Sequence, residues 1–499
     1  MLSRRTTFVA LSLLVALAML ASCAPPTPEK IVETVVVTKE VPVEVTKEVP
    51  VEVTVEVPVG VPVGELRPED IPIRVMGYGS PADVTRVTNL VEAARRINME
   101  WKKEEKPERI VCTVSEFETA GDIDGYRMRF ILASKAGTAP DIRAFTFTEV
   151  PEWAEAGYII PLDKYIEEYP DVFGDTIPAM WDACTWKGVR YAVPQDTEVR
   201  IVFFRKDKLR ELGWTDAEIE ALPDKVLAGE FTLDDMIALG KEAVDAGVTK
   251  WGIFHRPSKG FTFFMPYFAE GGLLQNPETG KLVLDESAAL YNLEFHYDIC
   301  QVSRITPPEI TTFSWREGIH PVVVAGDTLF WWGGTWHWAE YQRVDYGVGT
   351  FTEEEMWETF GFMLYPPKDK GGRPLSISNP YVYMISSSSK NPDLAFKVVA
   401  KASEPDLVVK HALESGHLAW RKAALEVPAY KENAFVMATT PLLEYTRFCP
   451  AHPLWEKYLS ITYSAIQGVE MGDMTPEEAL EFLKTELKAA IGDELEIVP

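Results

Sequence analysis

Short apolar runs alternate with amphipathic stretches along most of the chain. The run from Ile71 to Met76 predicts a strand that breaks at Gly77, and the helical spacing of apolar residues from Asp83 to Trp101 predicts a helix. Strands are also expected at 109–114, 142–147, 189–193 and 201–204, and helices ending near 135–137 and spanning 233–246 and 288–299. Strands and helices in this order are typical of α/β units with parallel sheets.

The N-terminal stretch has a different pattern, an apolar run from Phe8 to Leu20 behind Arg4 and Arg5. The run is too short to cross a membrane and has the length of a secretion signal's core. It ends at Cys23 in the letters LASC, which resemble the lipobox of bacterial lipoproteins. The resemblance implies a signal peptide at 1–22, lipidation of Cys23 and an anchor on the outer face of the cytoplasmic membrane. A plain signal peptide with a coincidental cysteine is the alternative.

An eight-residue repeat follows the lipobox. The octet of residues 38–45 recurs at 46–53 and, with changes, at 54–61. Valine and glutamate alternate as in a strand, but each copy contains a proline, which lacks the N–H that a sheet requires. We therefore expect residues 23–70 to form an extended tether. An edge hairpin packed on the body is the alternative.

The composition describes a globular body with a strongly acidic surface. Hydrophobic residues make up 46% of the 499 residues and charged residues 25%, which suits a protein with a packed core. The formal charge of −27 argues against a nucleic-acid partner, since binding phosphates requires clustered lysine and arginine. The same field disfavours an anionic ligand, although a local arginine can override it.

Sequence motifs for metal or catalytic chemistry are missing from the chain. Four cysteines follow Cys23 without a CxxC pair, so disulfides and buried free thiols both remain open; they are Cys112, Cys184, Cys300 and Cys449. The seven histidines show no metal-ligand spacing, and the sequence contains no GxxxxGK[ST], HExxH or GxSxG motif. We expect no cofactor and no metal.

Five stretches of the body match, in order, the motifs of one known family. They are 137–142 with 156–163, 188–194 with 203–207, 269–272 with 279–281, 333–338 and 387–396. In this order they resemble the solute-binding proteins of ABC importers, in the sugar-binding group that includes the maltose-binding proteins. The chain departs from that pattern after Gly416, where the family often has a proline before an arginine and this chain has the letters HLAWR at 417–421. It also departs at His337, which lies between two tryptophans.

This resemblance implies an α/β fold of two lobes joined by a hinge, each lobe a mostly parallel sheet flanked by helices. The N-terminal lobe would comprise 71–196 and 356–402, and the C-terminal lobe 197–355 and 403–499. Such a monomeric protein captures a solute, here most consistent with an oligosaccharide, and delivers it to the transmembrane subunits of an ABC permease. No chemistry by the chain itself is expected.

A neutral sugar requires aromatic platforms together with carboxylates, amides and arginines. Five of the fourteen tryptophans lie between Trp315 and Trp338. Trp336 stands where the family's tryptophan stacks on sugar, and Trp332 precedes it. Packing in the core is the alternative for both.

Further candidates follow from strand ends and from the resemblance. Ligands of α/β sheets lie beyond the carboxyl ends of strands, which favours Phe147 and Glu149. Asp196 falls at the expected crossing between lobes, where a solvated hinge residue is the alternative. Phe261 and Phe264 match family aromatics but would also suit a buried helix. The remaining candidates are Tyr78, Tyr381 and Arg421.

Two other functions share these features. A secreted carbohydrate-active enzyme would need two carboxylates at a defined separation, and with 76 acidic residues such pairs are uninformative. A sensor ectodomain would share the tether and need no permease.

Overall fold

The computed structural model describes residues 36–37, 51–52, 66–119, 123–343 and 351–499, and it divides into two compact units, 1–57 and 58–499. In the first unit, β1 (Val36–Val37) pairs antiparallel with β2 (Val51–Glu52). The expected signal peptide, Cys23 and most of the tether lie outside the described residues. A search of the described helices finds none with the length and apolar character needed to span a membrane.

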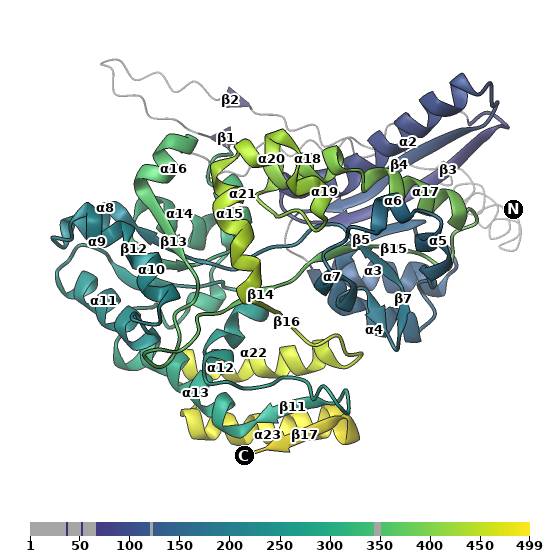
Figure 1. The fold of residues 1–499 in the computed structure, drawn as a ribbon. Helices are drawn as coiled ribbons and strands as arrows, with labels where there is room; N and C mark the ends of the chain where they lie inside the picture. The colour runs from purple at the N-terminus through teal and green to yellow at the C-terminus, as the bar shows by residue number, and fades with distance from the viewer. Residues whose placement is uncertain (1–35, 38–50, 53–65, 120–122, 344–350) are drawn as a thin grey trace, which may run out of the picture. The chain divides into compact units, whose positions relative to one another are not determined.

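The second unit contains a five-stranded sheet (Figure 1). Its strands, in spatial order, are β4 (Arg109–Glu118), β3 (Asp70–Tyr78), β5 (Ile142–Thr146), β15 (Tyr381–Ile385) and β8 (Ala192–Pro194). Helices cover both faces: α2 (Thr85–Lys103) packs with the side chains on one face, and α3 (Ile123–Lys135) with those on the other. This sheet forms the core of the first lobe.

A four-stranded sheet forms the core of the second lobe. Its spatial order is β10 (Trp251–Phe254), β12 (Thr328–Trp332), β9 (Val202–Arg205) and β13 (Phe360–Met363). Helix α11 (Leu233–Asp245) lies on β10, and α13 (Glu286–Tyr297) packs with α22 (Trp455–Met471) and α23 (Pro476–Ile491). Thr232 caps α11, because its hydroxyl accepts the N–H of Asp235.

Each sheet contains one strand that runs against all the others. In the first sheet β15 is antiparallel to both of its neighbours, and in the second sheet β9 is antiparallel to both of its neighbours. Both strands follow a chain crossing from the other lobe rather than a helix on the same sheet, so a parallel crossover is not required. The two-lobed α/β fold is confirmed, with sheets that are mixed at one strand each.

The lobe boundaries differ from those expected from the sequence. Residues 356–402 were expected in the first lobe, but β13 pairs with β9 in the second sheet. Conversely, 403–499 were expected in the second lobe, whereas α18 (Pro405–Ser415) packs on α2 of the first. The crossing lies instead near β14 (Ser376–Ser378), just before β15. The apolar pattern is the same for strands of either lobe, so it does not show which sheet a strand joins.

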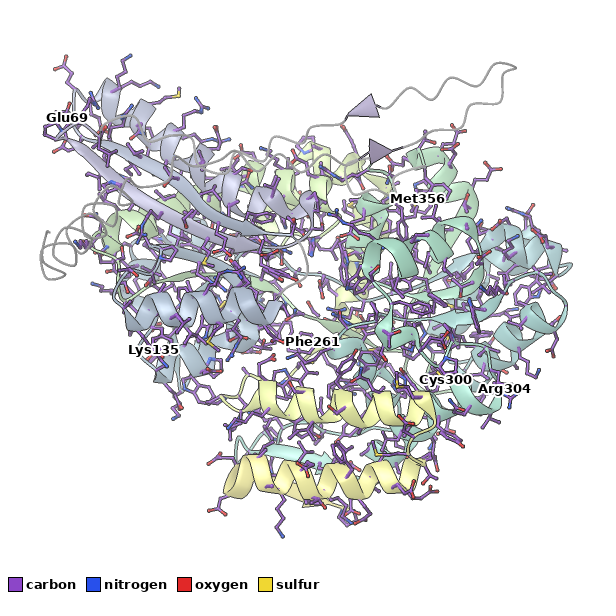
Figure 2. All side chains as sticks on the ribbon, turned by 180° about the vertical axis from the view of Figure 1, so that it is seen from behind. Glu69, Lys135, Phe261, Cys300, Arg304 and Met356 are labelled. Atoms are coloured by element: carbon purple, nitrogen blue, oxygen red, sulfur yellow. The ribbon has the colours of Figure 1, made fainter. Side chains whose placement is uncertain are left out.

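The secondary-structure predictions of the body are confirmed at the long elements. The helix expected at Asp83 begins at Thr85 after a short 3₁₀ turn at Pro81–Val84. The four cysteines after Cys23 are free thiols, among them Cys300, which Figure 2 labels inside the second lobe.

Candidate functional site

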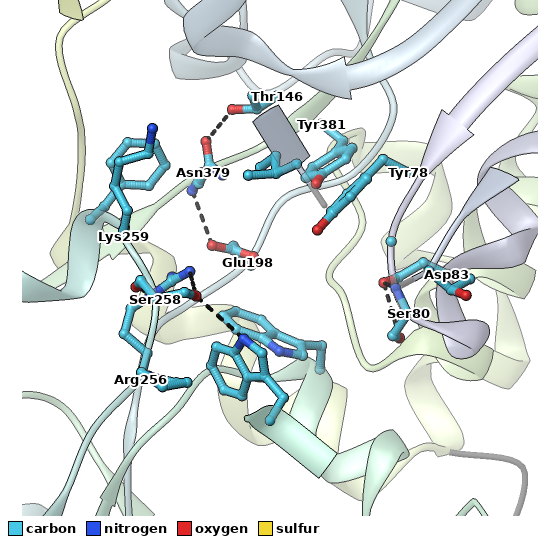
Figure 3. Close-up of a pocket in the computed structure, with 18 of the residues that line it drawn as sticks. Tyr78, Ser80, Asp83, Thr146, Glu198, Arg256, Ser258, Lys259, Asn379 and Tyr381 are labelled. Atoms are coloured by element: carbon cyan, nitrogen blue, oxygen red, sulfur yellow. Dashed lines mark hydrogen bonds between the residues drawn. The ribbon is translucent and has the colours of Figure 1, made fainter. Parts of the chain in front are cut away.

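A cavity of about 840 Å³ lies between the two lobes. It is lined where strands end: Tyr78 closes β3, Glu149 follows β5, Arg256 follows β10 and Trp336 follows β12. Figure 3 shows Arg256, Ser258 and Lys259 on one side of this cavity and Tyr78, Ser80 and Asp83 on the other. Both lobes therefore contribute to one site.

Two partly exposed indole rings give the cavity its apolar surfaces. Trp336 stacks on the His417 ring with centroids 5.8 Å apart, and the guanidinium of Arg200 lies 5.0 Å from the Trp336 centroid. Trp315 donates its indole N–H to the Ser258 hydroxyl at 3.3 Å. A Cβ at Gly334 would collide with the Trp336 ring, so the glycine allows the ring to fold back over its own turn.

Polar groups of the chain crossings form the base of the cavity. The Glu198 carboxylate pairs with Arg200 at 3.0 Å and accepts the backbone N–H of Asn379 at 3.3 Å. The Thr146 hydroxyl donates to the side-chain oxygen of Asn379 at 2.6 Å. Sequence reasoning missed these residues. The alternation of Glu198 and Arg200 around Val199, just before the strand expected at 201–204, is the signal that could have placed both on one face.

Burial raises the pKa of two carboxyl groups that line the cavity. Burial raises the pKa of Glu149 to about 8, against the opposing effect of Arg127, whose Nε lies 2.6 Å away. Burial likewise raises the pKa of Glu340 well above its usual range. Carboxyl groups accept hydrogen bonds, and the raised pKa favours the protonated form that can also donate, which suits a hydroxyl-bearing ligand.

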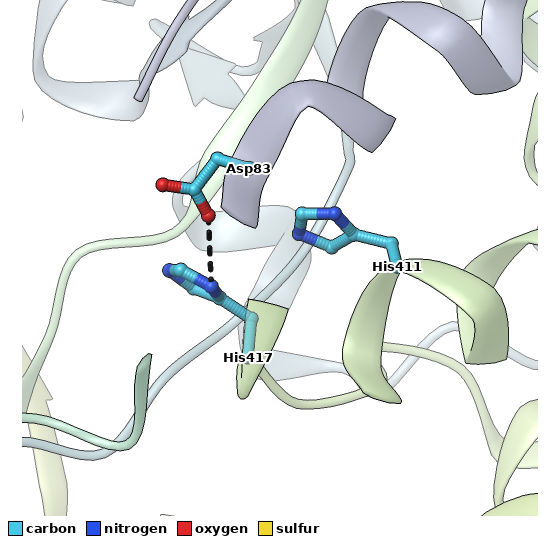
Figure 4. A group of neighbouring side chains, drawn as sticks. All are labelled: Asp83, His411 and His417. Atoms are coloured by element: carbon cyan, nitrogen blue, oxygen red, sulfur yellow. Dashed lines mark ion pairs between the residues drawn. The ribbon is translucent and has the colours of Figure 1, made fainter. Parts of the chain in front are cut away.

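A buried network joins the first crossing to the first lobe. The Asp196 carboxylate lies 2.8 Å from Arg86 Nη2 and 3.0 Å from His411 Nε2, and it accepts the N–H of Tyr381 at 2.9 Å. His417 Nδ1 lies 3.3 Å from Asp83, as Figure 4 shows. Burial would raise the pKa of Asp196, but Arg86 and the histidines lower it below its ordinary value.

Five of the expected ligand residues line the cavity. They are Trp336, Tyr78, Glu149, Phe261 and Tyr381. Phe261 lies between the lobes near the start of α22, where it stacks on Trp455 (Figure 2). The structure places these side chains together without a ligand, and their binding role stays a prediction.

The other five expected residues lie outside the cavity lining. Trp332 is 2% exposed and stacks on Phe295, because β12 is an inner strand with both faces covered. Phe147 packs on Phe448, and Phe264 packs on Trp455.

Asp196 and Arg421 are charged residues that make buried structural contacts instead. Asp196 is 1% exposed, so it is neither a cavity residue nor a solvated hinge residue. Arg421 pairs with Asp175 at 2.8 Å and donates to the Ser403 carbonyl at 2.7 Å. It therefore connects two segments of the first lobe that are distant in the sequence.

Histidines that are distant in the sequence meet carboxylates in three buried clusters. They are Asp83 with His411 and His417, His255 with His296 and Glu470, and His320 with His337 and Glu340. In the first cluster Arg86 Nη2 lies 3.1 Å from His417 Nε2, a cation that opposes a metal ion. In the second, both rings contact the same oxygen of Glu470, as in an ion pair. Sequence spacing did not reveal these clusters.

Comparisons with known proteins all point to one family of binding proteins. A family profile described as bacterial extracellular solute-binding protein matches residues 92–407. A maltotriose-binding protein of Pyrococcus abyssi is 21% identical over 343 residues, 68% of this chain and 66% of the relative. A binding protein of Brucella abortus is 24% identical over 359 residues, 69% of this chain and 78% of the relative.

Solved structures share the fold. The maltose-bound MalE3 of T. maritima superposes with a TM-score of 0.66 at 19% identity, covering 84% of this chain and 99% of that one. The two sheets, their reversed strands and the cavity between the lobes are thus found in a chain whose greater part matches one family profile. The chain belongs to the bacterial extracellular solute-binding proteins.

Proposed function

We propose that this protein captures an oligosaccharide in the cavity between its lobes and delivers it to the transmembrane subunits of an ABC importer. The observation that carries the proposal is the pair of partly exposed indole rings, Trp315 and Trp336, in one cavity with polar side chains of both lobes. Sugar rings present apolar C–H faces that stack on such platforms. A volume of about 840 Å³ suits a ligand of several rings.

The polar lining complements sugar hydroxyls. Glu198 and Asn379 offer an acceptor and an amide at the base, and Glu149, whose pKa is raised by burial, offers a carboxyl group. The names of similar proteins support the ligand class, since they include maltotriose-binding and arabinooligosaccharide-binding proteins. We include no catalytic step, in keeping with a family of binding proteins.

The proposal extends to the location of the protein. Removal of the signal peptide 1–22 and lipidation of Cys23 would anchor a monomer on the outer face of the cytoplasmic membrane. Mass spectrometry of the membrane fraction should find a diacylglyceryl group on an N-terminal Cys23, and Cys23→Ser should release the protein from the membrane.

Binding is tested by titrating the purified protein with neutral and acidic oligosaccharides, followed by calorimetry and melting temperature. One sugar class should stabilise the protein, and product analysis should find the sugar unchanged. Trp336→Ala should weaken binding about 10- to 100-fold without unfolding. Trp214→Ala, a partly exposed tryptophan outside the cavity lining, is the matched control. Hydrolysis of the sugar, or unchanged affinity in Trp336→Ala, would contradict the proposal.

A further inference from the structure

Arg256 stands out among the cations of the cavity. It follows β10 and lies against the Trp315 ring, 5.7 Å from its centroid. Its guanidinium donates to the carbonyl of Ser258 at 2.6 Å and to the Ser258 hydroxyl at 3.3 Å. Within the described part of the chain, no carboxylate oxygen comes within 4 Å of its nitrogens. Its known partners are therefore neutral.

Other cations of the cavity are neutralised by carboxylates. Arg86 pairs with Asp196, Arg127 with Glu149, and Lys259 with Glu456. Arg200 pairs with Glu198 at 3.0 Å. Burial and the positive charge of Arg200 together lower the pKa of Arg256 to about 10. Two guanidinium groups thus line the same cavity, and the carboxylate of Glu198 pairs with one of them, Arg200.

The remaining acidic residues of the cavity do not neutralise the positive charge of Arg256. Glu149 lies against Arg127, and burial raises the pKa of Glu149 and of Glu340, which disfavours their charged forms. Asp83 is committed to Ser80, whose N–H it accepts at 2.8 Å, and to His417. Arg256 is partly buried, and partial burial of a cation without a carboxylate partner is unfavourable, a cost that a bound anion would offset.

We propose that the captured saccharide carries an anionic substituent, bound by Arg256 with Arg200 while a sugar ring stacks on Trp315 or Trp336. This inference rests on the proposed capture of an oligosaccharide. The planar guanidinium forms two parallel hydrogen bonds to a carboxylate, sulfate or phosphate, which gives both charge and geometry. The acidic surface of the protein disfavours anions at long range, and this arginine pair overrides it locally.

The test compares acidic sugars with neutral counterparts of the same size. Calorimetry of the full mature chain would use trigalacturonate against its methyl ester, sulfated against desulfated disaccharides, and glucose 6-phosphate against glucose. These three pairs separate carboxylate, sulfate and phosphate as the anion. At least one acidic member should bind about 10- to 100-fold more tightly than its counterpart.

Variants assign the effect to the arginine. Arg256→Gln should lose that preference, and Arg256→Lys should keep part of it, because it retains the charge without the fork. Arg373→Gln, an exposed arginine outside the cavity lining, makes the same change in net charge and should bind as wild type. Circular dichroism and the melting temperature confirm that each variant is folded.

Three outcomes separate the two proposals. A neutral sugar that binds as tightly as its acidic counterpart, with unchanged affinity in Arg256→Gln, overturns the anionic ligand and leaves oligosaccharide capture standing. A folded protein that binds no saccharide of either kind overturns the proposed function itself. An acidic preference that survives in Arg256→Gln overturns the assignment to Arg256.

Discussion

Arg86 of helix α2 and Asp196 of the first crossing form a buried ion pair, with Nη2 and Oδ2 2.8 Å apart. Both side chains are 2% exposed or less. His411 Nε2 lies 3.0 Å from the same Asp196 oxygen, and the Arg86 guanidinium lies 3.6 Å from the centre of the Tyr381 ring. It therefore joins a helix of the first lobe to two of the chain crossings between the lobes.

Removing one partner of this pair should destabilise the protein strongly. Asp196→Asn removes the nearer of the two carboxylates that pair with Arg86 and leaves only Asp83, at 3.4 Å, so we expect a loss of about 3 kcal/mol in the free energy of unfolding. Urea denaturation measures the loss. Asp216→Asn changes the same charge on a side chain that is 76% exposed, and it should cost less than about 1 kcal/mol. Equal stability of the two variants would show that the buried pair contributes nothing.

The cluster of His255, His296 and Glu470 predicts acid sensitivity. Burial would raise the pKa of Glu470, but His255 and His296 lower it to about 2. The ordinary value is about 4.3, so the stabilisation is present above that pH and is lost as pH falls towards 2. We expect Glu470→Gln to be about 3 kcal/mol less stable at pH 6, and this difference to shrink between pH 5 and 2.

His296 adds to this loss in acid. Burial lowers its pKa below the usual 6.5, so the unfolded chain binds the proton more readily, and stability falls as pH drops below about 6.5. Urea denaturation at pH 7, 5 and 3 checks both effects. A difference between wild type and Glu470→Gln that stays constant with pH would contradict the ion pair.

A single methyl group at Gly334 should weaken ligand binding. The Cβ of Gly334→Ala meets the Trp336 ring, and the ring has to move off the cavity wall. We expect affinity to fall about tenfold with little change in melting temperature, since Trp336 is only partly buried. Gly137→Ala, at an exposed turn with open space around the position, is the control for binding. Wild-type affinity in Gly334→Ala would show that the position of this ring does not matter.

The free cysteines should be unreactive in the native protein. Burial raises the pKa of Cys112 to about 12 and that of Cys184 and Cys300 well above the usual range. Since the thiolate is the reactive form, we expect almost no labelling by a thiol reagent at pH 8 until guanidinium unfolds the chain. The melting temperature should not change with dithiothreitol. A melting temperature lowered by the reductant would indicate a disulfide.

The long elements and the fold class were predictable from the sequence. Apolar side chains at helical spacing between Asp83 and Trp101 fixed α2 to within a few residues, and the Thr232 cap marks the start of α11. The five shared stretches indicated two lobes through their resemblance to the family. The same resemblance pointed to Trp336, and a strand end pointed to Glu149. Both line the cavity, and their binding role stays a prediction.

The rest depends on contacts between distant residues. Trp331 and Trp332 look alike beside Trp336, and only the covering of both faces of β12 shows that they are core residues. Asp196 was placed correctly at a crossing, but its commitment to Arg86, 110 positions earlier, is a tertiary contact. The lobe boundary failed for the same reason, because no local pattern shows that β13 joins β9.

The two reversed strands also constrain the order in which the protein can fold. Strand β15 lies between β5 and β8, so the first sheet remains in two parts until residue 385 has left the ribosome. Strand β13 likewise completes the second sheet only after residue 363. Neither sheet can be completed from the first 350 residues, so the chain stays without a finished core for most of its synthesis. On the proposal that residues 1–22 are an export signal, this delay would keep the chain unfolded until it reaches the export machinery.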